Sequence, residues 1–249
     1  MKYLCFCSFN GRAYEGFQRQ TSKKTIQGTI EEKLSAICGE KTLIHGVGRT
    51  DSGVHATAYA FSFESKKKLN EKAFLFGLDS LLPSDIHVYS IREVDDSFDA
   101  RHSCRGKTYE YRIDYGEKDP LLVGLITHIA DPRFNPALFE DALQCFIGSH
   151  DFRNFTTKKE DKDDFKRTIE SIDAKVDEER KKITVRFKAN GFMTYQIRLM
   201  VGAAMKVAIG KLSPEDIAEK LKEGPRKIVP FKAPAEGLYL IEVDYGESF

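Results

Sequence analysis

The chain has 249 residues, of which 41% are hydrophobic and 31% are charged, and its formal net charge is +1. This balance is typical of a globular protein with a sizeable core, and it excludes disorder as the main state. No apolar run approaches the ~20 residues of a membrane span, and the N-terminus does not resemble a signal peptide. Five cysteines at irregular spacing favour free thiols over disulfides or structural zinc. We therefore expect a cytoplasmic protein that holds no metal.

The first part of the chain alternates strand and helix patterns. Thr25 is a good helix N-cap, and Ile26, Ile30 and Leu34 follow it at helical spacing. Aromatic residues recur at every second position within 56–64, which is typical of a strand. In chain order, the sequence predicts a strand at 2–9, a helix from Thr25 to Cys38-Gly39, strands at 42–47 and 56–64, a helix at 70–82, and strands at 86–94 and 107–114.

The segment 115–134 has no clear period and contains several glycines and prolines. It is expected to divide the chain into two halves, 1–115 and 116–249. Asn135-Pro136 then provides a favourable helix start, and a mixed charge run at 157–167 predicts a solvated loop. The other elements predicted for the second half are strands at 168–177 and 182–190, a helix at 195–209, a helix that begins at Ser213, and a strand at 238–245.

The order of these elements predicts the fold class. Strand, helix, strand, strand, helix, strand is the order of a split β-α-β unit, and the second half has a similar but less regular order. We expect an α/β (α+β) protein of two ferredoxin-like halves. Their strands are expected to form one continuous antiparallel sheet with helices on one face, and the active site is expected in a cleft between the halves.

The sequence GRTDSGVHA at residues 48–56 carries the most chemical information. Two glycines bracket a tight loop between predicted strands, and glycine permits close approach of a ligand to the backbone. The loop contains one carboxylate, Asp51, and one guanidinium, Arg49. Such a carboxylate can be a nucleophile, a base or a metal ligand, although an aspartate in a glycine-rich turn often only shapes the turn. His55 is expected to form structural hydrogen bonds rather than to bind a ligand.

This loop resembles the catalytic motif G-R-T-D-x-G-V-H-A of the tRNA pseudouridine synthase A family. Other segments resemble further motifs of that family, in the same order along the chain. They are YEGFQRQ at 14–20, TIQG at 25–28, FDAR at 98–101, KTYEY at 107–111, FMTYQIRLMVG at 192–202 and APAEGLYL at 233–240. Because the likeness spans nearly the whole chain, it is far more specific than any single motif.

The resemblance implies a cofactor-free isomerisation of uridine to pseudouridine in RNA. The glycosidic bond is cleaved, the uracil turns within the site, and its carbon 5 is joined to the ribose. By their places in the motifs, Asp51 matches the nucleophilic aspartate and Arg198 matches the arginine that pairs with it. Tyr109 matches the tyrosine that stacks on the uracil and helps remove the carbon-5 proton, and Arg49 matches the arginine that holds the target base out of its helix. By sequence pattern alone, Tyr109 also fits a core position and Arg198 a buried ion pair.

Basic residues gather near these motifs although the total charge is almost neutral. They fit a groove that follows RNA phosphates, and they also fit an ordinary charged surface. The residues expected to bind RNA are Arg49, Arg12, Arg19, Lys23, Lys24, Arg101 and Lys107, and a further basic group consists of Arg226, Lys227 and Lys232.

The sequence departs from the family pattern at a few positions. Tyr195 stands where the family has histidine, Leu199 stands where it has asparagine, and Arg153 and Asn154 replace small residues. The catalytic set is retained, so these differences bear on the choice of RNA. The first hypothesis is a homodimeric tRNA pseudouridine synthase that modifies positions 38, 39 and 40 of the anticodon arm. The alternatives are the same chemistry on another RNA, such as ribosomal RNA, and an RNA-binding protein without turnover.

Overall fold

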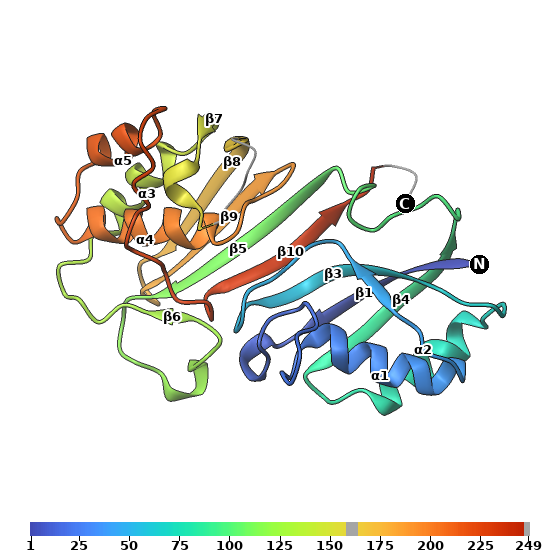
Figure 1. Ribbon diagram of the computed structural model, residues 1–249. Helices are drawn as coiled ribbons and strands as arrows, with labels where there is room; N and C mark the ends of the chain where they lie inside the picture. The colour runs from blue at the N-terminus through green and yellow to red at the C-terminus, as the bar shows by residue number, and fades with distance from the viewer. Residues whose placement is uncertain (158–163, 247–249) are drawn as a thin grey trace. The chain divides into compact units, whose positions relative to one another are not determined.

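The computed structural model describes residues 1–157 and 164–246, which form two compact units (Figure 1). The first unit contains Met1–Lys107 together with the end of the chain from Tyr239, and the second unit contains Thr108–Leu238. The predicted division at residue 115 had assigned the last strand to the second half. That strand instead belongs to the first unit, because it pairs with the strand that begins at His55.

The first unit follows the predicted order of elements. Its elements are β1 (Lys2–Phe9), a short 3-10 turn η1 (Gly11–Ala13), α1 (Ile26–Cys38), β2 (Ile44–Gly46), β3 (His55–Glu64), α2 (Glu71–Leu81), β4 (Ile86–Val94) and the closing strand β10 (Leu238–Asp244). The strands lie in the order β4-β1-β3-β2, and all three of these pairings are antiparallel. Helices α1 and α2 lie on the same face of this sheet (Figure 1). This is the ferredoxin-like arrangement that the element order predicts.

Helix α1 shows why the local sequence predictions succeed. The Thr25 side chain accepts a hydrogen bond from the backbone N–H of Gly28 at 3.2 Å, which satisfies one of the open donors of the first turn. Ile30 and Leu34 lie one turn apart and are fully buried against the sheet side of the unit. Gly39 ends the helix with φ +71°, a left-handed conformation that glycine adopts without a steric penalty.

Both faces of the first unit's sheet are covered. On the helix face, Phe63 of β3 stacks on Phe74 of α2 with ring centroids 5.6 Å apart. The small residue Ala60 points to the opposite face and is also fully buried. Its neighbour in the register, Phe6 of β1, packs edge-on against Tyr245 from the end of the chain. The closing segment therefore completes the core of the first unit.

The second unit contains β5 (Gly106–Asp114), a 3-10 turn η2 (Pro120–Leu122), β6 (Thr127–His128), α3 (Pro136–Gln144), β7 (Gly148–Asp151), a 3-10 turn η3 (Arg153–Phe155), β8 (Lys166–Asp177), β9 (Lys182–Ala189), α4 (Gln196–Ala208) and α5 (Pro214–Lys220). Its strands lie in the order β5-β9-β8-β7, and α3, α4 and α5 lie on one face of them (Figure 1). Asn135 caps α3 and Ser213 caps α5, as predicted. The short strand β7 was not predicted.

The predicted α+β class is confirmed, with two differences in detail. The pairings of β10 with β3 and of β6 with β5 are parallel, whereas an antiparallel sheet was expected throughout. The predicted solvated loop at 157–167 falls mainly on residues 158–163, which lie outside the described residues. Among the helices of the described residues, none is long and apolar enough to span a bilayer.

Candidate active site

The glycine-flanked loop lies between β2 and β3 of the first unit. Arg49 is exposed and Asp51 is half-buried. The backbone N–H of Val54 donates to the carbonyl of Asp51 at 3.2 Å, and Gly53 has φ +79°. Asp51 therefore does shape a turn, as the simpler interpretation had it, but it does so through its backbone.

The segment that resembles the family's first motif holds this loop in place. Gly16 has φ +88°, and a Cβ atom at this position would lie 2.7 Å from the carbonyl oxygen of Thr50. The backbone N–H of Phe17 donates to that same oxygen at 3.2 Å. The Ser52 hydroxyl donates to the carbonyl of Tyr14 at 3.1 Å. The two motifs, far apart in the sequence, thus form one packed backbone structure around Asp51.

The start of the loop is fixed from a second side. The Tyr59 hydroxyl donates a short hydrogen bond to the carbonyl of Gly48, and its ring stacks on Phe17 with centroids 4.1 Å apart. The Lys107 ammonium donates to the carbonyl of Val47 at 2.8 Å. Burial lowers the pKa of Lys107, and the neighbouring Arg101 lowers it further. Lys107, expected to bind RNA, therefore also supports the loop.

His55 at the end of the loop has the structural role that was predicted. Its Nδ1 accepts a hydrogen bond from the backbone N–H of Gly11 at 3.1 Å. Its ring stacks on Tyr239 of β10, with centroids 4.5 Å apart and planes inclined by 19°. The histidine is only 1% exposed, which leaves it no access to a ligand in solvent. His55 therefore connects β3 to the turn that follows β1 and to strand β10.

Arg198 lies in the first turn of α4 in the second unit and is 8% exposed. Its Nε donates to the carbonyl of Ala233 at 2.8 Å. Its guanidinium carbon lies 5.4 Å from the ring centroid of Tyr195, and the Lys232 ammonium lies 4.2 Å from the same centroid. Tyr195 adopts φ +62° as the N-cap residue of α4. One of the departures from the family pattern is thus in direct contact with a predicted catalytic residue.

Tyr109 and Tyr111 lie two residues apart on β5, and their side chains have different surroundings. Tyr111 is fully buried, and its hydroxyl donates to the carbonyl of Pro234 at 2.8 Å. Tyr109 is half-buried and makes an edge-to-face contact with Phe192, with ring centroids 5.4 Å apart. Tyr111 is therefore the core residue of the pair, and Tyr109 remains partly exposed.

The structure assigns the four predicted catalytic and base-holding residues to two different units. Asp51 and Arg49 belong to the first unit, and Tyr109 and Arg198 belong to the second. Their assembly into one site stays a prediction, and so do their roles.

Several of the predicted RNA-binding cations already have contacts within the first unit. Arg19 lies 3.2 Å from the carboxylate of Glu31, and Lys23 lies 3.8 Å from Glu15. Lys24 lies over the ring of Tyr14, 4.5 Å from its centroid. Arg12 is exposed. The side chains of Arg19 and Lys23 are 52% and 50% exposed, and Arg12 and Lys24 are also exposed. Their present contacts therefore do not prevent any of them from binding a phosphate.

A cavity of about 300 Å³ in the first unit opens beside the loop. It contains Arg49 and Arg101, two of the residues expected to bind RNA. It also contains three residues that the sequence analysis did not single out, His45, Asp99 and His102. Asp99 lies within the FDAR motif and His102 directly follows it, and this position is the only sequence signal that pointed to them.

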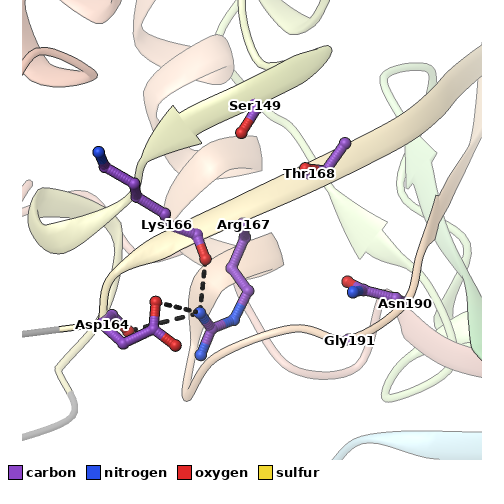
Figure 2. A pocket seen from close by; sticks show the side chains of 7 residues that line it. All are labelled: Ser149, Asp164, Lys166, Arg167, Thr168, Asn190 and Gly191. Carbon is purple, nitrogen blue, oxygen red and sulfur yellow. Dashed lines mark hydrogen bonds and ion pairs between the residues drawn. The ribbon is translucent and has the colours of Figure 1, made fainter.

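A second cavity, of about 440 Å³, lies in the second unit between the ends of β7, β8 and β9 (Figure 2). Its lining is polar, but none of the predicted site residues belongs to it. Arg167 turns back to Asp164 at 3.3 Å and to the carbonyl of Lys166 (Figure 2). Arg167 is paired with Asp164, Lys166 is paired with Glu223 at 2.9 Å, and no nucleophile or base of the motifs is present, so we assign the candidate site to the loop of the first unit.

The described residues contain no group of three or more histidine, cysteine, aspartate or glutamate side chains placed to hold a metal ion. The five cysteines are free thiols.

The fold and the loop together define an α+β protein with a half-buried carboxylate, Asp51, on a glycine-flanked loop beside a cavity that Arg49 and Arg101 help to line. Comparison with known proteins gives this class its family. A family model described as tRNA pseudouridine synthase matches residues 6–103 and 142–246. The chain belongs to this family, as its motifs indicated. The predicted enzyme class, a pseudouridine synthase and hence an isomerase, is confirmed with it.

Individual relatives match over almost the full chain. The proteins named tRNA pseudouridine synthase A from Streptococcus sanguinis (strain SK36) and Streptococcus pneumoniae (strain P1031) are each 36% identical over 248 residues, which is 99% of this chain and 99% of theirs. Among solved structures, a chain from the crystal structure of a Cbf5-Nop10-Gar1 complex is similar over 81% of this chain and 54% of its own. Its sequence identity is 12% and its TM-score is 0.36, so this likeness carries no argument.

Proposed function

We propose that this protein isomerises uridine to pseudouridine at positions 38, 39 and 40 of the tRNA anticodon stem-loop, with Asp51 as the nucleophile. The observation that carries the proposal is the way in which two family motifs are packed around Asp51. Gly16 contacts the backbone of Thr50 and Asp51 more closely than any other residue type would allow. Such a fixed loop aims a half-buried carboxylate in one direction.

The residues of the proposed site divide the steps of the reaction between them. The Asp51 carboxylate attacks ribose carbon 1′ and displaces uracil N1. The uracil then turns, and its carbon 5 bonds to carbon 1′ and displaces the carboxylate. The proton on carbon 5 leaves, and N1 takes up a proton. Arg198 pairs with the Asp51 carboxylate and keeps it ionised, because a nearby positive charge favours the charged form of an acid. Tyr109 stacks on the uracil and assists removal of the carbon-5 proton.

The target base must leave its helical stack before it can react, at a cost of a few kcal/mol. We propose that Arg49, on the glycine-flanked loop, keeps the target base outside its helical stack. Stacking on Tyr109 offsets part of the cost, about 1–3 kcal/mol. The remaining cations that we propose for RNA contact are Arg12, Arg19, Lys23, Lys24, Arg101 and Lys107.

Two features of the setting belong to the same proposal. We place the protein in the cytoplasm, because free thiols persist in a reducing compartment. We expect it to act as a homodimer that binds one RNA across both subunits, as the resemblance implies. Analytical ultracentrifugation at protein concentrations above and below the Kd of the dimer, with and without tRNA, measures the oligomeric state.

A different RNA target was considered because of Tyr195 and Leu199. Leu199 is 2% exposed, so it packs in the core and does not select an RNA. Tyr195 is half-buried and lies beside the cations of Arg198 and Lys232. Only Tyr195 therefore keeps the ribosomal RNA alternative open, and tRNA remains the preferred substrate.

Release of tritium from RNA labelled at uridine carbon 5 tests the function directly. Unmodified tRNA and ribosomal RNA are incubated with the protein, and we expect release from tRNA alone. Asp51→Asn keeps the shape of the side chain but not the nucleophile, so it should abolish release while tRNA still binds. Asp96→Asn, at an exposed position of the same unit, is the matched control and should turn over normally. Full activity of Asp51→Asn would refute the mechanism, and release from ribosomal RNA alone would refute the substrate.

A further inference from the structure

The cavity beside the loop has the composition of a nucleotide site. Arg49 and Arg101 contribute guanidinium groups to it, and His45 and His102 contribute imidazoles. Both arginines are exposed, and neither has an ion-pair partner among the described residues. Planar guanidinium groups bind phosphate with two parallel hydrogen bonds, so this pair is well suited to a phosphodiester.

Asp99 is the one carboxylate in the cavity, and the surrounding backbone fixes it there. One oxygen, Oδ1, accepts hydrogen bonds from the backbone N–H groups of Arg101 at 2.8 Å and His102 at 2.7 Å. The same oxygen lies 3.1 Å from Nδ1 of His102. Burial opposes ionisation of Asp99, but these hydrogen bonds and the imidazoles of His102 and His45 outweigh it, and its pKa is lowered.

The remaining carboxylate oxygen can accept a hydrogen bond from a ligand. A site for a bare anion would not contain an ionised acid, since like charges repel. A ribonucleotide carries both a phosphate and hydroxyl or base N–H donors, so it matches this mixed lining. Phe17 and Ile44 also border the cavity, but each is only 2% exposed, so they support its wall from within the core. A volume of about 300 Å³ is at the lower end of ligand sites, as for a single nucleotide.

The place of the cavity along the chain indicates which nucleotide it takes. Arg49 lies two residues before Asp51, on the same loop. We propose that the cavity is a subsite for one nucleotide next to the target uridine, with its phosphate on Arg49 and Arg101 and a donor of its ribose or base on Asp99. The subsite rests on the proposed function. It holds the strand beside the extruded uridine, so that the uridine is presented to Asp51.

A neutral phosphate analogue tests this contact at the level of single atoms. Anticodon stem-loop RNA is prepared with one methylphosphonate linkage, either 5′ or 3′ of the target uridine, and its affinity is measured by filter binding. Asp51→Asn is the parent protein in this assay, so that binding occurs without turnover. We expect one of the two substitutions to weaken binding by about tenfold, because a charged hydrogen-bonded contact is lost.

Arg101→Gln is the diagnostic variant, because Arg49 is also proposed to hold the extruded base. In the Arg101→Gln protein the methylphosphonate should cost clearly less affinity than in the parent, because only the Arg49 contact is left to lose, and the salt dependence of binding should fall by about 0.7 in slope. Arg105→Gln removes the same charge four residues away, outside the cavity, and is the matched control. It should retain the full penalty and the parent slope.

The outcomes separate the two proposals. An equal methylphosphonate penalty in Arg101→Gln and Arg105→Gln would overturn the subsite, and so would the absence of a penalty at both linkages in the parent. If the wild-type protein still releases tritium from tRNA in that case, the proposed function stands without the subsite. A protein that neither binds the stem-loop nor releases tritium would overturn both. Near-ultraviolet circular dichroism of each variant confirms that the fold is intact.

Discussion

Replacing Gly16 with alanine is the sharpest test of how the loop is held. The native φ of +88° costs an L-residue roughly 1–2 kcal/mol. The added Cβ would also stand 2.7 Å from the Thr50 carbonyl oxygen, which belongs to the backbone and cannot rotate away. Relieving that overlap adds about 1–3 kcal/mol, as for an overpacked core. We expect Gly16→Ala to lose about 2–5 kcal/mol in the free energy of unfolding, and the shifted loop to lower kcat by about a hundredfold.

Gly39→Ala provides the matched control for the backbone conformation. Gly39 has φ +71°, but a Cβ atom there meets nothing within 4 Å. It should lose only the conformational part, about 1–2 kcal/mol, and leave kcat unchanged. Urea denaturation at 25 °C measures stability, and single-turnover tritium release, made where each variant is folded, measures catalysis. The reasoning fails if the two variants lose equal stability and turn over equally well.

Three further substitutions test individual contacts by urea denaturation. Thr50→Val should leave the free energy of unfolding unchanged or raise it by up to about 1 kcal/mol, because the Thr50 hydroxyl is buried without a hydrogen-bond partner among the described residues. A decrease of more than about 1 kcal/mol in the free energy of unfolding would show that the hydroxyl has a structural partner. His55→Phe should cost about 1–3 kcal/mol, since the buried N–H of Gly11 loses its acceptor, and an unchanged midpoint would contradict this. Tyr245→Phe should cost about 1 kcal/mol through the lost 2.7 Å hydrogen bond to Ala100, and it should not change the m-value.

Most of the regular elements were predictable because their signals are local. Asn70, Asn135 and Ser213 each cap a helix through a side-chain hydrogen bond, and the helices begin where those residues predict. Strand β7 was missed because its four residues, GSHD, have neither alternation nor apolar content. It is a strand only because β8 pairs with it.

The pairing of the last strand with β3 could not be predicted, because no local pattern records which distant edge a strand will join. The same reason limits the site. The loop around Asp51 was predicted from its glycines and its resemblance to a known motif. His45, Arg49 and Asp99 line one cavity because of the β2–β3 pairing and the path of the chain after β4. Neither of these can be predicted from the spacing of the three residues in the sequence.

The return of β10 to the first unit has a consequence for biosynthesis. The edge of β3 at His55 and Ala56 pairs with Tyr239 and Leu240, which are synthesised after the whole second unit, Thr108–Leu238. Until then the nascent first unit carries an open strand edge, which is prone to wrong pairing with other chains. The strand that follows the Asp51 loop thus gains this partner only after the second unit has been made, so a product truncated within the second unit would carry the motif without this pairing.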